Sequence, residues 1–237
     1  MTHYLQEKTI PGLHEALVRR LPPLNRDGAV LDVGCGTGAW LERLSRHGFR
    51  NLYGIDVELA QIGSTSAKVF QMDVDKDDLQ VADVKFQLIT AIEVIEHIEN
   101  TGRLLSLVES HLSDNGVFLL TTPNIHSLHS RLRFLLKGKL QFFDEKADRT
   151  HIKPFVFTGL RRMLSRHGLR VRSLWSFPER GGSIASRRSL RLVSRMLGAV
   201  IPNPMPGDIL CVLIEKSMWP WHGDPANSGD SRIIEGT

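Results

Sequence analysis

Hydrophobic residues in this chain form short apolar runs that alternate with amphipathic stretches. The stretches with helical spacing are at 13–21, 38–47, 101–112 and 158–167. The apolar runs have the length of buried strands and lie at 29–33, 51–56, 68–71, 86–91, 116–122, 169–177 and 208–215. Alternating strands and helices predict one largely parallel sheet with helices on both faces, and the polar segment Ser113–Gly116 predicts a turn before the fifth strand.

The first predicted strand ends in a glycine-rich turn. Leu31-Asp32-Val33 is followed by glycines at 34, 36 and 38, and a helix begins directly afterwards. Glycine has no Cβ, so the backbone can approach a bound nucleotide-like ligand closely at such a turn. The spacing Gly34, Gly36 and Ala39 also satisfies the dinucleotide fingerprint Gly-x-Gly-x-x-Gly/Ala, so this turn by itself leaves two kinds of cofactor open.

Polar residues at the ends of the next three strands favour one of these cofactors. Asp56 ends the second strand, Asp73 follows the third, and Glu93 to His97 follow the fourth. In this order the motifs resemble those of the class I S-adenosylmethionine-dependent methyltransferases, over about residues 30–216. The sequence Glu-Val-Ile-Glu-His at 93–97 resembles a motif of small-molecule methyltransferases that include the ubiquinone-pathway O-methyltransferases.

This resemblance implies a fold, a cofactor and its binding residues. The fold is a doubly wound, seven-stranded, mostly parallel Rossmann-like sheet whose last strand is antiparallel. S-adenosylmethionine is the implied methyl donor and S-adenosylhomocysteine its product, with Asp56 on the ribose and Asp73 on the adenine amino group. Cys35 is expected to fill the tight turn rather than to act as a nucleophile. The full implied set is Asp32, Gly34, Cys35, Gly36, Gly38, Asp56, Val57, Met72, Asp73, Val74, Ala91 and Glu93.

Three residues are candidates for catalysis. Methyl transfer is an in-line displacement, so the protein mainly supplies alignment, and a base is needed only where the acceptor loses a proton. His97 is the leading candidate for that base, and the alternative is that it only shapes the pocket. His151 lies in a segment resembling one that follows the fifth strand in related bacterial enzymes, and it is predicted to close over the acceptor. Glu93 is the third candidate.

A metal-dependent alternative rests on four of the same residues. Glu93, Glu96, His97 and His151 resemble the Glu-x-x-Glu-His plus distal His site of the methyltransferases that modify the 3′-terminal 2′-hydroxyl of small RNAs. Carboxylates and imidazoles of this kind hold a divalent ion that polarises a hydroxyl. The main prediction is an enzyme without a metal ion. The alternative is an RNA 2′-O-methyltransferase that holds a metal ion at this site.

A segment at 126–148 is an insertion relative to the minimal fold. It predicts a short, basic, amphipathic helix followed by an aromatic turn. One interpretation is a lid whose apolar face is buried by the edge of the sheet, and the other is a contact with a membrane surface or a lipid substrate, extended by an arginine-rich helix at 183–197. A membrane or lipid contact favours a lipid-linked metabolite or a glycan precursor as the methyl acceptor, in addition to small soluble acceptors.

Composition and charge limit the expected domain organisation, partners and location of the protein. With 237 residues, 41% of them hydrophobic, we expect one domain over 1–217 and a disordered tail over 218–237. The net charge is +4, but 161–195 holds ten arginines and one acid, which fits a solvated face, a contact with anionic lipid or a phosphate site. Few aromatic residues accompany these arginines, so nucleic acid is not favoured. Two distant cysteines and no apolar run long enough for a bilayer predict a cytoplasmic protein, with peripheral contact at the inner membrane surface as the alternative.

Overall fold

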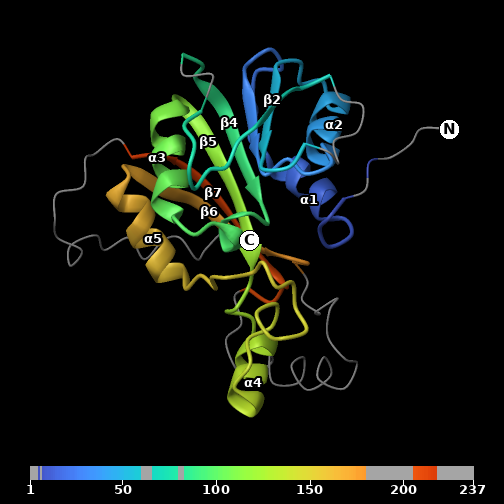
Figure 1. Ribbon diagram of the computed structural model, residues 1–237, viewed down its shortest axis with the longest axis vertical. Helices are drawn as coiled ribbons and strands as arrows, with labels where there is room; N and C mark the ends of the chain where they lie inside the picture. Colours follow the sequence, from blue (N-terminus) through green and yellow to red (C-terminus); the bar gives the residue numbers. More distant parts are fainter. Residues whose placement is uncertain (1–4, 6, 60–65, 80–82, 180–204, 218–237) are drawn as a thin grey trace.

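The computed structural model describes residues 5, 7–59, 66–79, 83–179 and 205–217. Seven strands form one sheet in the order β3-β2-β1-β4-β5-β7-β6, in which β7 runs antiparallel to both of its neighbours (Figure 1). The predicted doubly wound, mostly parallel sheet is therefore confirmed. The strands are β1 (Val30–Val33), β2 (Leu52–Asp56), β3 (Lys68–Gln71), β4 (Phe86–Ile92), β5 (Leu112–Pro123), β6 (Leu169–Phe177) and β7 (Ile209–Lys216).

Helices cover both faces of the sheet (Figure 1). On one face, Leu17 and Trp40 belong to the same buried apolar cluster as Leu88 of the sheet. On the other face, Leu105 and Leu164 share a second cluster with strand residues. Both sides of the central strands are thus removed from water, which explains their nearly continuous apolar sequences. The helices are α1 (Leu13–Arg20), α2 (Ala39–Arg46), the 3₁₀ turn η1 (Ile95–His97), α3 (Thr101–His111), α4 (Leu128–Lys137) and α5 (Phe157–Arg166).

The start of β5 differs from the prediction. The strand begins at Leu112, directly after α3, and the predicted turn Ser113–Gly116 lies within it as an irregularity. Phe86 of β4 pairs with Leu112 and Leu88 pairs with Val117, so β5 has extra residues between these two pairs. Leu112 is fully buried, and its pairing to β4 extends the strand across a polar segment that propensity alone assigns to a turn.

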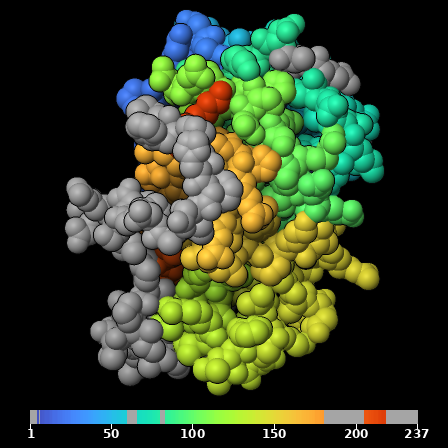
Figure 2. Space-filling view, turned by 90° about the vertical axis from the view of Figure 1, so that its left-hand side faces the viewer, coloured from blue at the N-terminus to red at the C-terminus, as the bar shows by residue number. Residues whose placement is uncertain are grey.

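The insertion at 126–148 begins with α4, which stands away from the sheet at one end of the molecule (Figures 1 and 2). Ser127 caps this helix by accepting a hydrogen bond from the Ser130 amide at 3.1 Å. The buried residues of α4 lie in its first turn, whereas Phe134, Leu135 and Leu136 are 54%, 79% and 69% exposed. The predicted burial of the apolar face against the sheet is therefore not observed.

Two other predictions concern segments that the structure does not describe. The arginine-rich helix at 183–197 and the tail at 218–237 lie outside the described residues. Within the described part of the chain, no helix combines the length and the apolar character needed to cross a membrane.

Candidate active site

A cavity of about 880 Å³ lies at the carboxyl ends of β1, β2 and β4. The order of strands along the chain reverses between β1 and β4, and open α/β sheets bind ligands at this reversal. Residues from the glycine turn, from the ends of β2 and β4, from the N-terminal segment and from the end of the insertion all line the cavity. Its volume falls near the upper end of the usual range for small-molecule sites.

The three glycines after β1 have different roles. Gly34, Gly36 and Gly38 adopt φ values of 70°, 54° and 82°, which are left-handed and favour glycine. A Cβ on Gly34 would lie 2.5 Å from Val94 Cγ2, so packing requires that glycine. A Cβ on Gly36 would meet nothing within 4 Å, because Gly36 borders the cavity. Gly38 caps α2 and is absent from the cavity lining.

Asp56 fixes the glycine turn to the end of β2. The Gly36 amide donates to Asp56 Oδ2 at 2.7 Å, and the Glu58 amide donates to Oδ1 at 3.0 Å. The carboxylate also lines the cavity, as do the glycine turn and the exposed side chain of Val57. This placement fits the role that the sequence implied for Asp56, since a carboxylate held by backbone amides keeps further lone pairs for ribose hydroxyls.

Asp32 is buried at the end of β1 and linked to α2 through β4. Thr90 Oγ1 donates to Asp32 Oδ1 at 2.7 Å, and Trp40 Nε1 donates to Thr90 Oγ1 at 3.1 Å. Burial raises the pKa of Asp32 to about 7; the Thr90 hydrogen bond opposes this effect and the charge of Asp56 adds to it. Burial likewise raises the pKa of the Cys35 thiol, which fits a residue that fills the turn and is no nucleophile.

The raised pKa of Asp32 predicts a pH dependence of stability. Because the folded protein holds this proton more tightly than the unfolded chain, the stabilisation is complete below the ordinary aspartate pKa and is lost as pH rises to about 7. The whole loss amounts to about 4 kcal/mol. Denaturant unfolding of the ligand-free protein at pH 5 and pH 8 should show Asp32→Asn gaining stability relative to the native chain at the higher pH.

The control for this measurement is Asp27→Asn, which removes an exposed carboxylate paired with Arg50. Exposed pairs contribute little to stability, so this variant should follow the native chain at both pH values. Equal pH profiles for Asp32→Asn and the native chain would show that Asp32 is ionised in the folded protein throughout this range.

The predicted adenine side of the cavity is apolar with an acidic rim. Met72 and Val74 are buried and line the cavity, as the sequence implied. Asp73 also lines it, but its Oδ2 accepts a hydrogen bond from Lys76 Nζ at 2.6 Å, and this bond is the main cause of its lowered pKa. Ala91 is fully buried within β4 and does not reach the cavity. The contact of Asp73 with adenine stays a prediction.

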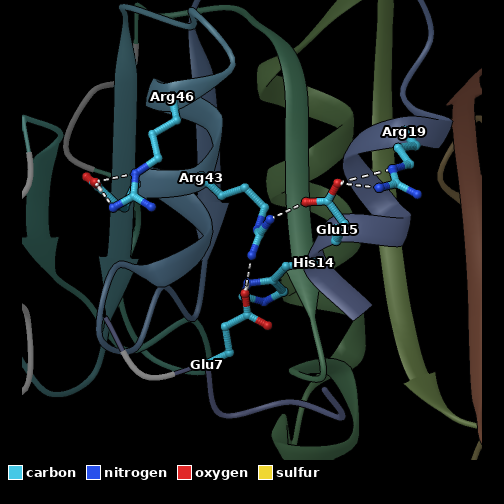
Figure 3. Close-up of polar contacts among 7 residues, drawn as sticks. Glu7, His14, Glu15, Arg19, Arg43 and Arg46 are labelled. Atoms are coloured by element: carbon cyan, nitrogen blue, oxygen red, sulfur yellow. Dashed lines mark hydrogen bonds and ion pairs between the residues drawn. The ribbon is translucent and has the colours of Figure 1, made fainter. Parts of the chain in front are cut away.

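The N-terminal segment adds residues to the site that the motifs did not indicate. Thr9, Ile10 and His14 line the cavity beside Trp40. Figure 3 shows the polar contacts that hold this segment on α2: Arg43 pairs with Glu7 at 2.6 Å and also with Glu15. The His14 ring packs edge-on against Trp40 at 5.3 Å, and burial lowers the pKa of His14 to about 4. Only the helical spacing at 13–21 could have signalled this segment.

Glu93 occupies an unusual backbone conformation at the end of β4. Its φ of 55° is rare for a residue with a side chain, and such strain persists where the surroundings enforce it, often at functional sites. The Glu93 amide donates to Thr121 Oγ1 at 3.0 Å, and that hydroxyl donates to Glu93 Oε1 at 3.1 Å. Burial raises the pKa of Glu93 to about 7. The conformation fixes this carboxyl group at the cavity wall.

His97 and His151 both line the same cavity, and their rings contact each other there. Their ring centroids are 4.7 Å apart, with an interplanar angle of 67°. His97 Nδ1 lies 3.1 Å from the carbonyl oxygen of Thr150, and His151 Nδ1 lies 2.8 Å from that of Phe142. A carbonyl only accepts, so both Nδ1 atoms carry hydrogen, and Nε2 is the ring nitrogen that holds a lone pair in the neutral form of either ring. Burial and then the charge of His151 lower the pKa of His97, which favours its neutral form.

The insertion contributes the outer wall around these histidines. Phe142, Ala147 and Asp148 follow α4 and line the cavity, whereas the exposed end of α4 does not. Asp148 accepts hydrogen bonds from the Thr150 amide at 2.9 Å and from its hydroxyl at 2.6 Å, which shapes the loop before His151. The part of the predicted lid that reaches the cavity is therefore the segment after α4.

Comparisons with known proteins agree with this architecture. The family model described as a methyltransferase domain matches residues 1–174. A probable S-adenosylmethionine-dependent methyltransferase of Mycolicibacterium smegmatis is 28% identical over 130 residues, which cover 50% of each protein. The ubiquinone biosynthesis O-methyltransferase of Rickettsia felis is 31% identical over 102 residues, which cover 40% of this chain and 41% of that protein. The chain thus spans about half or less of the length of these curated relatives.

A solved structure supports the fold independently. The crystal structure of an S-adenosylmethionine-dependent methyltransferase from Archaeoglobus fulgidus superposes with a TM-score of 0.62 at 21% identity, and the match covers 86% of this chain and 93% of the other. In this chain the glycine turn, Asp56 and the apolar pair Met72 and Val74 line one cavity. The chain belongs to the family described as a methyltransferase domain, and it has the class I methyltransferase fold.

Proposed function

We propose that this enzyme methylates a hydroxyl oxygen of a small-molecule acceptor. The observation that carries the proposal is the His97–His151 pair, which lines the same cavity as the glycine turn. A hydroxyl must lose its proton when its oxygen is methylated, and a neutral imidazole is the side chain best suited to receive or polarise that proton near pH 7.

Each part of the cavity has a distinct task in this proposal. When bound, S-adenosylmethionine supplies a methyl group made electrophilic by the attached sulfonium. The glycine turn and Asp56 hold the adenosine, and Glu93 and the histidines hold the acceptor. The acceptor oxygen forms the new C–O bond while the C–S bond breaks and its electron pair passes to sulfur. The hydroxyl proton passes to one of the two histidines, so alignment and one proton transfer account for the chemistry.

Two further observations support a hydroxylated metabolite. The Rickettsia felis relative is named as an O-methyltransferase of ubiquinone biosynthesis. The cavity volume of about 880 Å³ is in the range of sites that enclose small molecules, which fits a cofactor together with a compact acceptor group. The test is transfer from S-adenosylmethionine to catechols and other phenols, with and without a prenyl chain, followed by mass spectrometry. An O-methyl ether is the expected product, and exclusive N- or C-methylation would overturn the proposal.

RNA with a terminal 2′-hydroxyl is the second acceptor to be tested. The Glu/His cluster at 93–97 favours it, because a ribose diol also presents hydroxyl oxygens to such groups. Against it, Arg170 and Arg172 of the basic segment both pair with Glu215, so part of the described positive charge is compensated. Methylation of an RNA oligonucleotide in preference to every phenol would establish this alternative.

A lipid-linked acceptor is favoured by the α4 apolar patch, which comprises Phe134, Leu135 and Leu136. These side chains are exposed on a helix that also carries lysine and arginine, the combination typical of helices that bind anionic membrane surfaces. The patch lies at the end of the molecule formed by α4 and the segment after it (Figure 2). We therefore include peripheral contact with a membrane in the proposal, as a way to reach amphiphilic acceptors.

Cosedimentation with vesicles tests this contact. The native chain should bind vesicles containing anionic lipid, and binding should weaken as salt is raised. Replacing both Leu135 and Leu136 by serine should weaken binding about tenfold, since apolar surface that would enter the interface is lost. The control is Val156→Ser, which changes another exposed apolar residue that lies outside the patch. Equal binding by the double variant and the control would show that the patch does not contact lipid.

A further inference from the structure

Three side chains in and behind the cavity wall have the arrangement of a cation site. Glu96, His97 and His151 each offer a ligand atom, and these atoms lie within 4.8 Å of one another. His97 and His151 line the cavity, while Glu96 is fully buried behind them. We propose that these three residues bind one divalent cation. The inference rests on the proposed function for its catalytic meaning, but the binding itself does not depend on that function.

Both imidazoles are already oriented for coordination. Each Nδ1 donates its hydrogen to a backbone carbonyl, of Thr150 for His97 and of Phe142 for His151. Histidine ligands of metals are commonly held in this way, because the bond from one ring nitrogen fixes the ring and leaves the lone pair of the other for the metal. The two ring centroids are only 4.7 Å apart, which is close enough for both rings to coordinate one ion.

The surroundings of Glu96 support a cation site independently of the histidines. Its carboxylate is fully buried, and neither oxygen has a hydrogen bond of acceptable geometry within the described part of the chain. A buried carboxyl group without a partner is costly, and natural proteins keep such groups where a ligand or an ion satisfies them.

The backbone joins the two elements that carry the ligands. The amides of Ile152 and Lys153 both donate to the carbonyl oxygen of Glu96, at 3.0 and 3.2 Å. The loop of His151 is thereby fixed to the turn of Glu96 and His97, although 53 residues separate His97 from Thr150. A preorganised site of this kind needs only small side-chain adjustments to bring three ligand atoms to one ion.

The donor set indicates the class of cation. Two imidazole nitrogens and one carboxylate oxygen suit zinc, cobalt, manganese or iron(II), whereas calcium and magnesium prefer oxygen ligands alone. Three protein ligands leave at least one position open, as in catalytic zinc sites. Glu93 is outside this cluster, and its Oε1 accepts a hydrogen bond from the Thr121 hydroxyl at 3.1 Å. The site therefore has three protein ligands, in contrast to the four of the metal alternative considered from the sequence.

A cation here would change how the acceptor is activated. An open coordination position facing the cavity suits a hydroxyl oxygen, whose pKa falls on binding a divalent ion. The acceptor proton would then pass to solvent, and both Nε2 lone pairs would serve as ligands. The substrate class that follows is a hydroxyl with a second oxygen nearby, such as a catechol or a vicinal diol, which can occupy two open positions.

Titration with metal alone tests the site. We expect the full chain, treated with a chelator and then dialysed, to bind one equivalent of Zn²⁺ by calorimetry and to give a visible absorption band with Co²⁺. Glu96→Gln and His151→Ala should each weaken Zn²⁺ binding by about 10- to 100-fold. Glutamine matches the size of the uncharged glutamic acid, so Glu96→Gln should fold, and thermal unfolding checks this. If it does not fold, His151→Ala carries the test.

A matched control excludes unspecific binding to histidine. His111 is partly buried, and its Nδ1 also faces a backbone carbonyl, that of Leu107 at 3.0 Å, but it lies outside the cavity. His111→Ala should bind Zn²⁺ like the native chain. Absence of stoichiometric binding, or equal affinities for the native chain, Glu96→Gln and His151→Ala, would overturn the proposed cation site.

The same protein distinguishes this inference from the proposed function. Methyl transfer to a hydroxyl that is unaffected by chelator, in a chain that binds no Zn²⁺, would remove the cation site and leave O-methylation intact. Stoichiometric Zn²⁺ binding that needs Glu96 and His151, without any O-methyl product from the phenol and RNA panels, would keep the site and remove the proposed function.

Discussion

Replacing Gly36 by alanine should weaken the binding of S-adenosylhomocysteine at least about 100-fold. A Cβ at this position would meet no protein atom within 4 Å and would point into space that belongs to the cavity, so its effect falls on the ligand. The lost affinity corresponds to about 3 kcal/mol or more. The φ of 54° adds a backbone penalty of about 1–2 kcal/mol, which lowers the free energy of unfolding but does not act on the ligand directly.

Gly138→Ala separates these two effects. Gly138 ends α4 with a φ of 62°, and a Cβ there also meets nothing within 4 Å. Both variants should therefore lose a similar amount of stability in denaturant unfolding, while only Gly36→Ala loses affinity in calorimetry. If the two variants bind S-adenosylhomocysteine equally well, the cofactor does not approach the backbone at Gly36, and the glycine turn has a structural role alone.

The sequence predicted the sheet, and most residues that it predicted for the cofactor line one cavity, because local rules apply to both. Buried parallel strands are apolar on both faces, and a turn in which Gly36 must be left-handed leaves a visible glycine pattern. The acidic residue Asp56 is placed by the end of its strand, since parallel strands bring their carboxyl ends to one edge. Such features need no information about distant contacts.

The remaining features depend on contacts between distant parts of the chain. His14 reaches the cavity only because Glu7 and Glu15 pair with Arg43 on another helix, and no pattern in the sequence marks these pairs. The exclusion of Glu93 from the Glu96 cluster follows from its left-handed backbone and its bond to Thr121, whereas the linear motif groups the two glutamates together. The exposure of α4 was likewise not predictable, since an amphipathic helix does not tell which surface covers it.

Replacing His97 by alanine should lower the turnover of the enzyme about 10²- to 10⁴-fold. The loss has this size whether His97 takes the acceptor proton or holds a cation that polarises the hydroxyl. Affinity for S-adenosylhomocysteine should stay within about twofold, because the residues proposed to hold the cofactor, the glycine turn and Asp56, belong to other segments of the cavity lining. His111→Ala, which removes a similar imidazole from outside the cavity, should retain native turnover and native affinity.

Comparison with Glu96→Gln and His151→Ala then separates the two roles of His97. Glu96 is buried behind the histidines and does not line the cavity, so it has no direct route to an acceptor proton. If His97 is a base acting alone, Glu96→Gln should keep most of the turnover and chelator should have no effect. If the three residues hold a cation, all three variants should fail to a similar extent, and added Zn²⁺ or Mn²⁺ should restore only the chelated native enzyme. Native turnover in His97→Ala would exclude both roles, and alignment of the acceptor with the methyl group would then account for catalysis by itself.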